Sequence, residues 1–211
     1  MRDATALMTA LTLTQRPSLS RTVRSAPLPR GVTFLLEVAA GDAEALADAG
    51  AITGQSEERL IDAASFFVEQ VLLYRSASCY RVLGANRDES TAELRHHMAL
   101  LMRWLHPDTV ASGLREGAID RTVFAPRVLQ AWETLKTAKS RAAYDAAEQK
   151  GARRAPKAGM GRLPAGAKRG TPSSGSRQPG GRPRGTNRLE ILPALRDWFW
   201  SRLVRYFPGS Q

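Results

Sequence analysis

The stretch 86-NRDESTAELRHHMALLMRWLHPD-108 decides the fold that the sequence predicts. Ser90 and Glu93 form an S-x-x-E capping box, in which each side chain bonds a backbone N–H group that the helix leaves unpaired. Apolar residues then recur at spacings of three and four, as on one face of an amphipathic helix. Pro107 disfavours helical geometry in the residue before it. The sequence therefore predicts a helix over about residues 91–105.

The two faces of this predicted helix carry different side chains. Its apolar stripe consists of Leu94, Met98, Leu101, Met102 and Leu105. The opposite face consists of Arg95, His96, Ala99 and Arg103. Leu100 and Trp104 lie on a shoulder outside the stripe, and two interpretations of them stay open: partial exposure, or contact with a helix from upstream. The helix is expected to pack on one side and to present a basic face on the other.

A second helix is expected after a loop, over about residues 121–137. Pro126 fits its first turn, because a proline there lacks only an N–H group that has no helical partner. The predicted core stripe of this helix consists of Val128, Ala131, Trp132 and Leu135. A last short helix is expected in residues 139–149, and a short turn or helix that ends at Gly84 precedes the first one.

Residues 31–75 are predicted to form a helical extension. The pair Gly41-Asp42 marks a break at which Asp42 begins a new helix. The strongest helical pattern follows in residues 54–74, where the Ser56 side chain is expected to accept a bond from a free backbone N–H. Its apolar stripe consists of Leu60, Ala64, Phe67, Val71 and Tyr74. A single helix of this length is marginal in water, so it needs a surface to pack against.

Residues 1–30 are predicted to be a disordered tail. They are rich in Ser, Thr and Arg, only weakly apolar, and contain Asp3 as their one acidic residue. No convincing cleavage site follows the weakly apolar stretch, so a secretory signal is not expected. An organellar transit peptide has a similar composition and stays open as the alternative to a tail.

The net charge of +11 is concentrated in one segment. Residues 150–188 contain 11 Lys or Arg and no Asp or Glu, whereas residues 1–149 contain 17 basic and 18 acidic residues. The segment is also rich in Gly, Pro and Ser, so it is predicted to be a disordered linker. Its cations also suit weak, non-specific binding to nucleic acid or to an anionic membrane. No aromatic residue is interleaved for base stacking, so sequence-specific recognition is not expected.

Residues 189–207 are predicted to form a C-terminal amphipathic helix. One face of this helix consists of Leu192, Leu195, Phe199 and Leu203, and further aromatic and arginine residues flank it. Two interpretations stay open for this segment. It can lie on a membrane surface, or it can dock on a partner protein or on its own domain.

The composition excludes several classes of site. Cys79 is the one cysteine, which excludes an intrachain disulfide and a cysteine-based zinc site. His96 and His97 are adjacent and point to different faces of their helix, so neither a metal site nor another cofactor is expected. No run of 18 apolar residues occurs, so no membrane-spanning helix is expected. A cytoplasmic location is predicted, with peripheral membrane association as the alternative.

Three features occur in a fixed order: "YRVLG" at residues 80–84, the helix that ends in His106-Pro107-Asp108, and "VLQAWETLKTAKSRAAYD" at residues 128–145. In this order they resemble the J domain of DnaJ-family co-chaperones, over residues 76–149. The resemblance implies an all-α fold, with an antiparallel hairpin of two helices flanked by short helices. A Gly/Phe-rich region and CxxCxGxG zinc repeats are missing from the sequence, so the chain is similar to minimal members of the family. The resemblance also implies a hairpin core made of Tyr80, Leu83, Leu94, Met98, Leu101, Leu105, Val128, Ala131, Trp132, Leu135 and Tyr144.

The resemblance implies a binding function without catalysis. In J domains, the HPD loop and the basic face of the preceding helix dock on a DnaK-type chaperone, of the seventy-kilodalton heat-shock class, and stimulate its ATPase. The protein would then be an allosteric partner and not an enzyme. Carried over by position, the partner-binding residues are His106, Pro107, Asp108, Arg95 and Arg103, with His96 as a lesser candidate.

This basic face has fewer basic residues than is usual in the family. Ala99 and Thr109 stand where basic residues are common in the family, so weak, salt-sensitive docking or a specialised partner is expected. The alternative function belongs to a different class. It is a scaffold, or an adaptor that binds polyanions or membranes, in which the J domain is degenerate.

Overall fold

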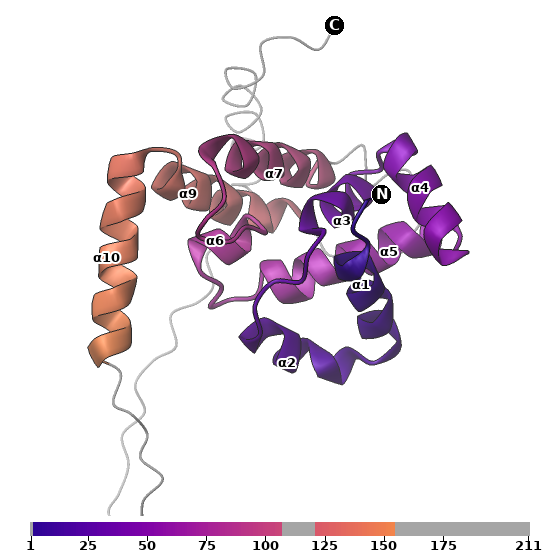
Figure 1. Ribbon diagram of the computed structural model, residues 1–211, viewed down its shortest axis with the longest axis horizontal. Coiled ribbons are helices and arrows are strands. Elements are labelled where there is room, and N and C mark those ends of the chain that lie inside the picture. Colours follow the sequence, from indigo (N-terminus) through magenta and orange to yellow (C-terminus); the bar gives the residue numbers. More distant parts are fainter. Residues whose placement is uncertain (1, 107–120, 155–211) are drawn as a thin grey trace, which may run out of the picture. The chain divides into compact units, whose positions relative to one another are not determined.

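The computed structural model describes residues 2–106 and 121–154, and every regular element in these ranges is helical (Figure 1). The prediction of an all-α fold is therefore confirmed for this part of the chain. The elements all belong to one compact unit. In chain order they are α1 (Thr5–Gln15), the 3₁₀ helix η1 (Pro17–Leu19), α2 (Ser20–Ser25), α3 (Val32–Ala39), α4 (Ala43–Thr53), α5 (Glu57–Phe67), the π-helix η2 (Val68–Leu72), α6 (Cys79–Val82), α7 (Thr91–Trp104), the 3₁₀ helix η3 (Arg121–Phe124), α9 (Ala125–Leu135) and α10 (Ala138–Arg154).

The prediction that residues 1–30 are a disordered tail is wrong. They form α1, η1 and α2, and α1 packs against α5 and α3. The reason lies in side-chain size and spacing, because Ala6 and Ala10 let α1 approach its neighbours closely while Leu7 fills the space between them. All three side chains have 0% exposure. A stretch that is only weakly apolar on average therefore buries a well-defined face against its neighbours.

A glycine allows the beginning of α1 to meet the beginning of α3. The Ala6 N–H donates a 2.9 Å hydrogen bond to the Arg30 carbonyl oxygen. Gly31 follows with a φ of +78°, and a Cβ added there would lie 1.9 Å from the Asp3 carbonyl oxygen. Because that contact is with backbone, no other residue fits at this position without moving α1.

The predicted break at Gly41-Asp42 is confirmed. Gly41 has a φ of +72°, and the Asp42 carboxylate accepts a 3.1 Å bond from the Ala45 N–H at the beginning of α4. Ser56 does occupy the N-cap position of α5, but its side chain makes no capping hydrogen bond, so this part of the prediction is wrong. The extended backbone of Ser56 begins the helix without that bond.

The α5–η2 helix lies at the centre of the fold. Leu60, Ala64, Phe67 and Val71 of the predicted stripe have 0% exposure, whereas Tyr74 is half-buried beyond the helix end. The last turn is a π-helix, closed by a 2.9 Å bond from the Leu73 N–H to the Val68 carbonyl oxygen.

The capping box at the beginning of α7 is confirmed. The Ser90 N–H donates to Glu93 Oε2 at 2.7 Å, and the Glu93 N–H donates to Ser90 Oγ at 3.2 Å. Helix α7 ends at Trp104, one residue before the predicted end, and α9 ends at Leu135, two residues before its predicted end.

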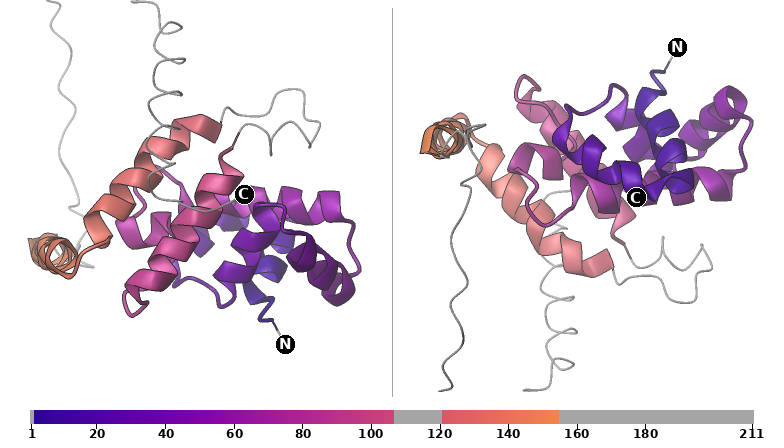
Figure 2. Two further views of the ribbon diagram at one scale, coloured as in Figure 1. Left: turned by 90° about the horizontal axis from the view of Figure 1, so that it is seen from above. Right: turned by 90° about the horizontal axis from the view of Figure 1, so that it is seen from below.

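Helices α7 and α9 pack side by side (Figure 2). The end of α7 lies by the beginning of α9, where the Trp104 and Phe124 rings stack with centroids 6.5 Å apart. The residues before α7 lie by the beginning of α10, where Arg141 donates to the Arg87 carbonyl oxygen at 2.5 Å. These two contacts imply that α7 and α9 run in opposite directions.

The two interpretations of Leu100 and Trp104 are resolved in favour of packing. Trp104 is 1% exposed, and its Nε1–H donates a 3.1 Å hydrogen bond to Ser65 Oγ on α5. Leu100 is also buried. The hydrophobic core therefore continues from the N-terminal helices into α7 and α9, without a packing boundary at residue 75.

Helix α10 is longer than the short helix predicted, because it continues to Arg154. It therefore includes the first five residues of the segment predicted to be a disordered linker. The remainder of that segment and the amphipathic helix predicted at residues 189–207 lie outside the described residues. Within residues 2–106 and 121–154, no helix has the length and apolar character needed to cross a membrane.

Candidate partner-binding surface

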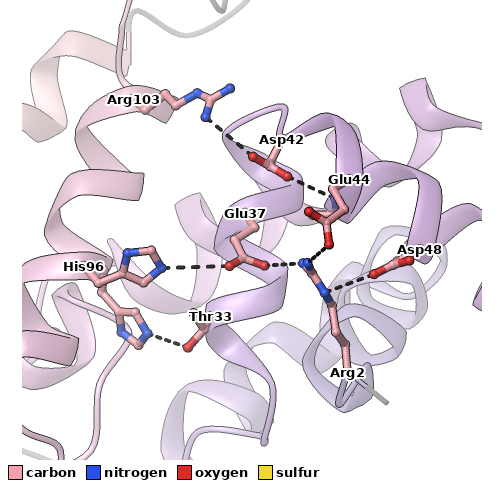
Figure 3. A network of polar contacts seen from close by, with 10 residues as sticks. Arg2, Thr33, Glu37, Asp42, Glu44, Asp48, His96 and Arg103 are labelled. Carbon is pink, nitrogen blue, oxygen red and sulfur yellow. Dashed lines mark hydrogen bonds and ion pairs between the residues drawn. The ribbon is translucent and has the colours of Figure 1, made fainter. Parts of the chain in front are cut away.

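The candidate surface begins with the exposed side of α7. Arg95, His96 and Arg103 are all exposed on this helix, and Ala99 between them is half-buried. His96 and Arg103 are seven residues apart, or almost two full turns, so they point in nearly the same direction. Figure 3 shows both side chains extending from α7 toward α3 and α4. The structure thus brings together three of the predicted partner-binding residues on one helix.

The fourth predicted residue, His106, lies just beyond the end of this helix. The Leu105 N–H still bonds the Leu101 carbonyl oxygen at 2.9 Å, whereas the His106 N–H bonds the Arg103 carbonyl oxygen at 3.1 Å. The backbone hydrogen bonds thus change from a four-residue to a three-residue spacing, and the helix ends. The His106 side chain is half-buried. Pro107 and Asp108 lie outside the described residues.

Two carboxylates of the N-terminal helices approach the basic side of α7. His96 Nε2 lies 3.9 Å from Glu37 Oε1, and Arg103 Nη1 lies 3.8 Å from Asp42 Oδ2 (Figure 3). Both distances exceed a hydrogen bond. The His96 and Arg103 side chains are each 52% exposed, so each contact contributes little to stability.

Arg2 connects one of these carboxylates, Glu37, to two more. Its guanidinium lies 2.8 Å from Glu37 Oε2, 2.8 Å from Glu44 Oε1 and 3.0 Å from Asp48 Oδ2. Sequence reasoning missed Arg2 altogether, because no local pattern links residue 2 to residues on α3 and α4. His96 and Arg103 therefore each have a carboxylate nearby, which the sequence of α7 alone does not indicate.

His97 points to the other side of α7 and is 3% exposed. Its Nδ1 lies 3.2 Å from the Leu83 carbonyl oxygen, which can only accept, so the proton of the neutral ring is on Nδ1. Its Nε2, 2.7 Å from Thr33 Oγ1, then accepts the hydroxyl proton. Burial lowers the pKa of His97, so the ring stays neutral at pH 7 and links α3, α6 and α7. The spacing of three from Leu94 and four to Leu101 is the signal that could have identified it.

The residues predicted for the hairpin core are mostly buried. Those with at most 6% exposure are Tyr80, Leu83, Leu94, Met98, Leu101, Leu105, Val128, Ala131, Trp132 and Leu135. Tyr144 differs, because it is half-buried on α10 and its hydroxyl group forms two hydrogen bonds. This hydroxyl accepts a 3.0 Å bond from the Cys79 N–H and donates a 2.8 Å bond to Glu148.

A polar cluster links α6 to α10. The Tyr80 hydroxyl donates to Asp145 Oδ2 at 3.1 Å and accepts from Arg141 Nε at 3.0 Å. Burial raises the pKa of Tyr80, so its hydroxyl remains a donor across the physiological range. These contacts explain why the Arg-Ala-Ala-Tyr-Asp stretch of α10 lies against α6.

Comparison of the chain with family models, with curated proteins and with solved structures gives no match. In the described part of the chain, no group of three or more His, Cys, Asp and Glu side chains is placed to hold a metal ion.

Proposed function

We propose that this protein is a J-domain co-chaperone, which recruits a DnaK-type chaperone and stimulates its ATPase through His106, Pro107 and Asp108. One observation carries the proposal. Helix α7 packs one side against α9, exposes Arg95 and Arg103 on another, and ends at Trp104, two residues before the His-Pro-Asp sequence begins. A J domain requires this combination of helix pair, basic face and motif position.

The neighbouring elements support the proposal. A J-domain hairpin would use α7 and α9 as its two helices, with α6 and α10 as the flanking helices. The tyrosine of the Tyr-Arg-Val-Leu-Gly motif on α6 bonds the aspartate and the arginine of the Arg-Ala-Ala-Tyr-Asp stretch on α10. The first and last parts of the sequence pattern are therefore in direct contact, which gives a physical reason for their occurrence together.

The chemistry of the motif suits docking. Pro107 restricts the backbone and so reduces the entropy lost when the motif binds. Asp108 can accept charge-assisted hydrogen bonds from an arginine of the chaperone. Arg95 and Arg103 would attract an acidic partner surface and mainly raise the association rate. The protein itself would make or break no covalent bond.

The proposal is tested by single-turnover ATP hydrolysis on a DnaK-type chaperone, with the wild-type protein and with His106→Gln. We expect wild type to accelerate hydrolysis and His106→Gln to abolish the acceleration, because the substitution removes the ring that begins the motif. Glu58→Gln, an exposed substitution in the first turn of α5, serves as the control and should act like wild type. Acceleration by His106→Gln equal to that of wild type would refute the proposal.

A second candidate is a scaffold, or an adaptor that binds polyanions or membranes, with a degenerate J domain. The carboxylates of Glu37 and Asp42 beside His96 and Arg103 favour it, because they weaken the attraction of this surface for an acidic chaperone. The 11 cations of residues 150–188 are the binding segment in this case. Salt-dependent binding to nucleic acid or anionic liposomes that survives in His106→Gln, without ATPase stimulation by wild type, would select this candidate.

A further inference from the structure

Both ends of the connection between α7 and η3 lie on one face of the α5–η2 helix. Trp104, the last residue of α7, donates from Nε1 to Ser65 Oγ at 3.1 Å. Arg121, the first residue of η3, places its Nε 3.4 Å from Glu69 Oε1. Ser65 and Glu69 are four residues apart, so they lie on the same side of their helix. Residues that are 17 positions apart in the sequence are thus held by neighbouring positions on one helix.

The two ends also contact each other. The Arg121 guanidinium lies 4.7 Å from the centroid of a Trp104 ring, within the range of a cation–π contact. Phe124, one turn of η3 later, stacks on the same tryptophan. Trp104 is therefore enclosed by Ser65, Arg121 and Phe124, which together fix its orientation.

The ion pair between Arg121 and Glu69 is protected from water more than the pair that Arg103 of α7 forms with Asp42. The Arg121 and Glu69 side chains are 18% and 17% exposed, whereas Arg103 and Asp42 are 52% and 39% exposed. A partly desolvated pair interacts more strongly and is screened less by salt than an exposed one. The Arg121–Glu69 pair is therefore able to hold the beginning of η3 in one place.

A second arginine reinforces the same junction. Arg127 of α9 donates from Nη1 to the Leu73 carbonyl oxygen at 2.5 Å and from Nη2 to the Tyr74 carbonyl oxygen at 2.8 Å. These carbonyl groups follow η2, where a helix leaves its last acceptors without intrahelical partners. The end of η2 and the beginning of α9 are thus joined by charge-assisted bonds.

We propose that Ser65 and Glu69 are positioning residues for His106, and that the N-terminal helices are an integral part of the chaperone-binding unit. This inference rests on the proposed function. By fixing Trp104 and Arg121, the α5–η2 helix sets the place and direction from which His106 approaches the chaperone. Because Trp104 and Arg121 are already fixed before binding, less conformational entropy is lost when His106 docks on the chaperone.

The test compares Glu69→Gln, Arg121→Gln and their combination with the control Glu58→Gln, which removes an exposed carboxylate from the same helix. Three quantities are measured on the full chain: the melting temperature, the His106 imidazole NMR signals, and single-turnover ATPase stimulation as a function of co-chaperone concentration. The ATPase is assayed at a temperature where circular dichroism shows every variant to be folded. Half-maximal concentration and maximal rate are then determined separately.

We expect Glu69→Gln and Arg121→Gln each to raise the half-maximal concentration about tenfold, the scale of coupling between residues in contact. The double variant should be no worse than either single one, because both substitutions break the same contact. The His106 imidazole signals should shift in all three, although no substituted residue is adjacent to His106 in the sequence. Glu58→Gln should match wild type.

The outcomes separate this inference from the proposed function. Unchanged half-maximal concentrations and unchanged His106 signals in folded Glu69→Gln would overturn the positioning role, even if its melting temperature falls. If wild type itself gives no stimulation, the proposed function fails. In that case, the His106 signals still decide whether Glu69 positions this residue.

Discussion

At the scale of single residues, His97 shows how burial gives a polar side chain a structural role. Its ring lies between three elements and bonds Leu83 and Thr33 in a single neutral tautomer. Glu89 Oε2 lies 3.7 Å from Nδ1, and burial raises the pKa of that carboxyl. Protonation of His97 would place a second donor at Nε2, so the Thr33 hydroxyl would have to turn and accept, and a positive charge would be buried.

This arrangement predicts a pH dependence of stability. Because burial lowers the pKa of His97 below its ordinary value of 6.5, the unfolded chain takes up a proton before the folded one. The stabilisation is therefore complete above about pH 6.5 and is lost as the pH falls from there toward the folded-state pKa. Urea unfolding of wild type and His97→Gln from about pH 7.5 to about pH 5, on both sides of the ordinary histidine pKa of about 6.5, tests this. Equal loss of stability in both proteins would contradict the prediction.

At the scale of elements, the sequence correctly predicted features that depend on residues close together in the chain. The capping box of α7 and the break at Asp42 were predicted correctly, because hydrogen bonds between residues three apart determine both. The α1 helix was missed, because its folding depends on α5, more than forty residues downstream, and weak hydrophobicity does not reveal such a partner. Ser56 was placed correctly as an N-cap, yet its side chain makes no capping bond.

Helix α1 provides a matched pair of substitutions. Leu7 is 0% exposed and Met8 is 51% exposed on the same turn. Leu7→Ala should reduce the free energy of unfolding by about 2–5 kcal/mol, because it leaves a cavity between α1 and its neighbours. Met8→Ala should change it by less than about 0.5 kcal/mol, as for ordinary surface positions. Chemical denaturation measures both, and equally small effects would mean that α1 does not belong to the core.

The contact between α4 and α7 predicts a gain of function under the proposed mechanism. Asp42→Asn removes the charge 3.8 Å from Arg103, while asparagine remains able to cap α4. Chaperone binding should tighten by at most about fivefold, since an exposed pair is worth ~1 kcal/mol or less. The half-maximal concentration for ATPase stimulation reports this, with Glu58→Gln as the charge control. Weaker stimulation by Asp42→Asn would show that the carboxylate does not compete for Arg103.

At the scale of the whole molecule, the sequence predicted a helical extension over residues 31–75 and a separate unit over residues 76–149. In the structure, the two share one hydrophobic core. Trp104 was recognised as unusual, and its burial against Ser65 was one of two interpretations. The carboxylates that approach α7 could not be predicted, because Glu37 and Asp42 lie about sixty residues upstream of their partners and belong to an ordinary acidic pattern. The candidate surface is therefore shaped by helices outside the segment that carries its motif.

We propose above all that His106 and the residues after it act on a DnaK-type ATPase. Single-turnover ATP hydrolysis with wild type, His106→Gln and Glu58→Gln tests it most directly. We expect stimulation by wild type and Glu58→Gln and none by His106→Gln, with all three proteins equally folded. No stimulation by wild type, or equal stimulation by His106→Gln, would contradict it.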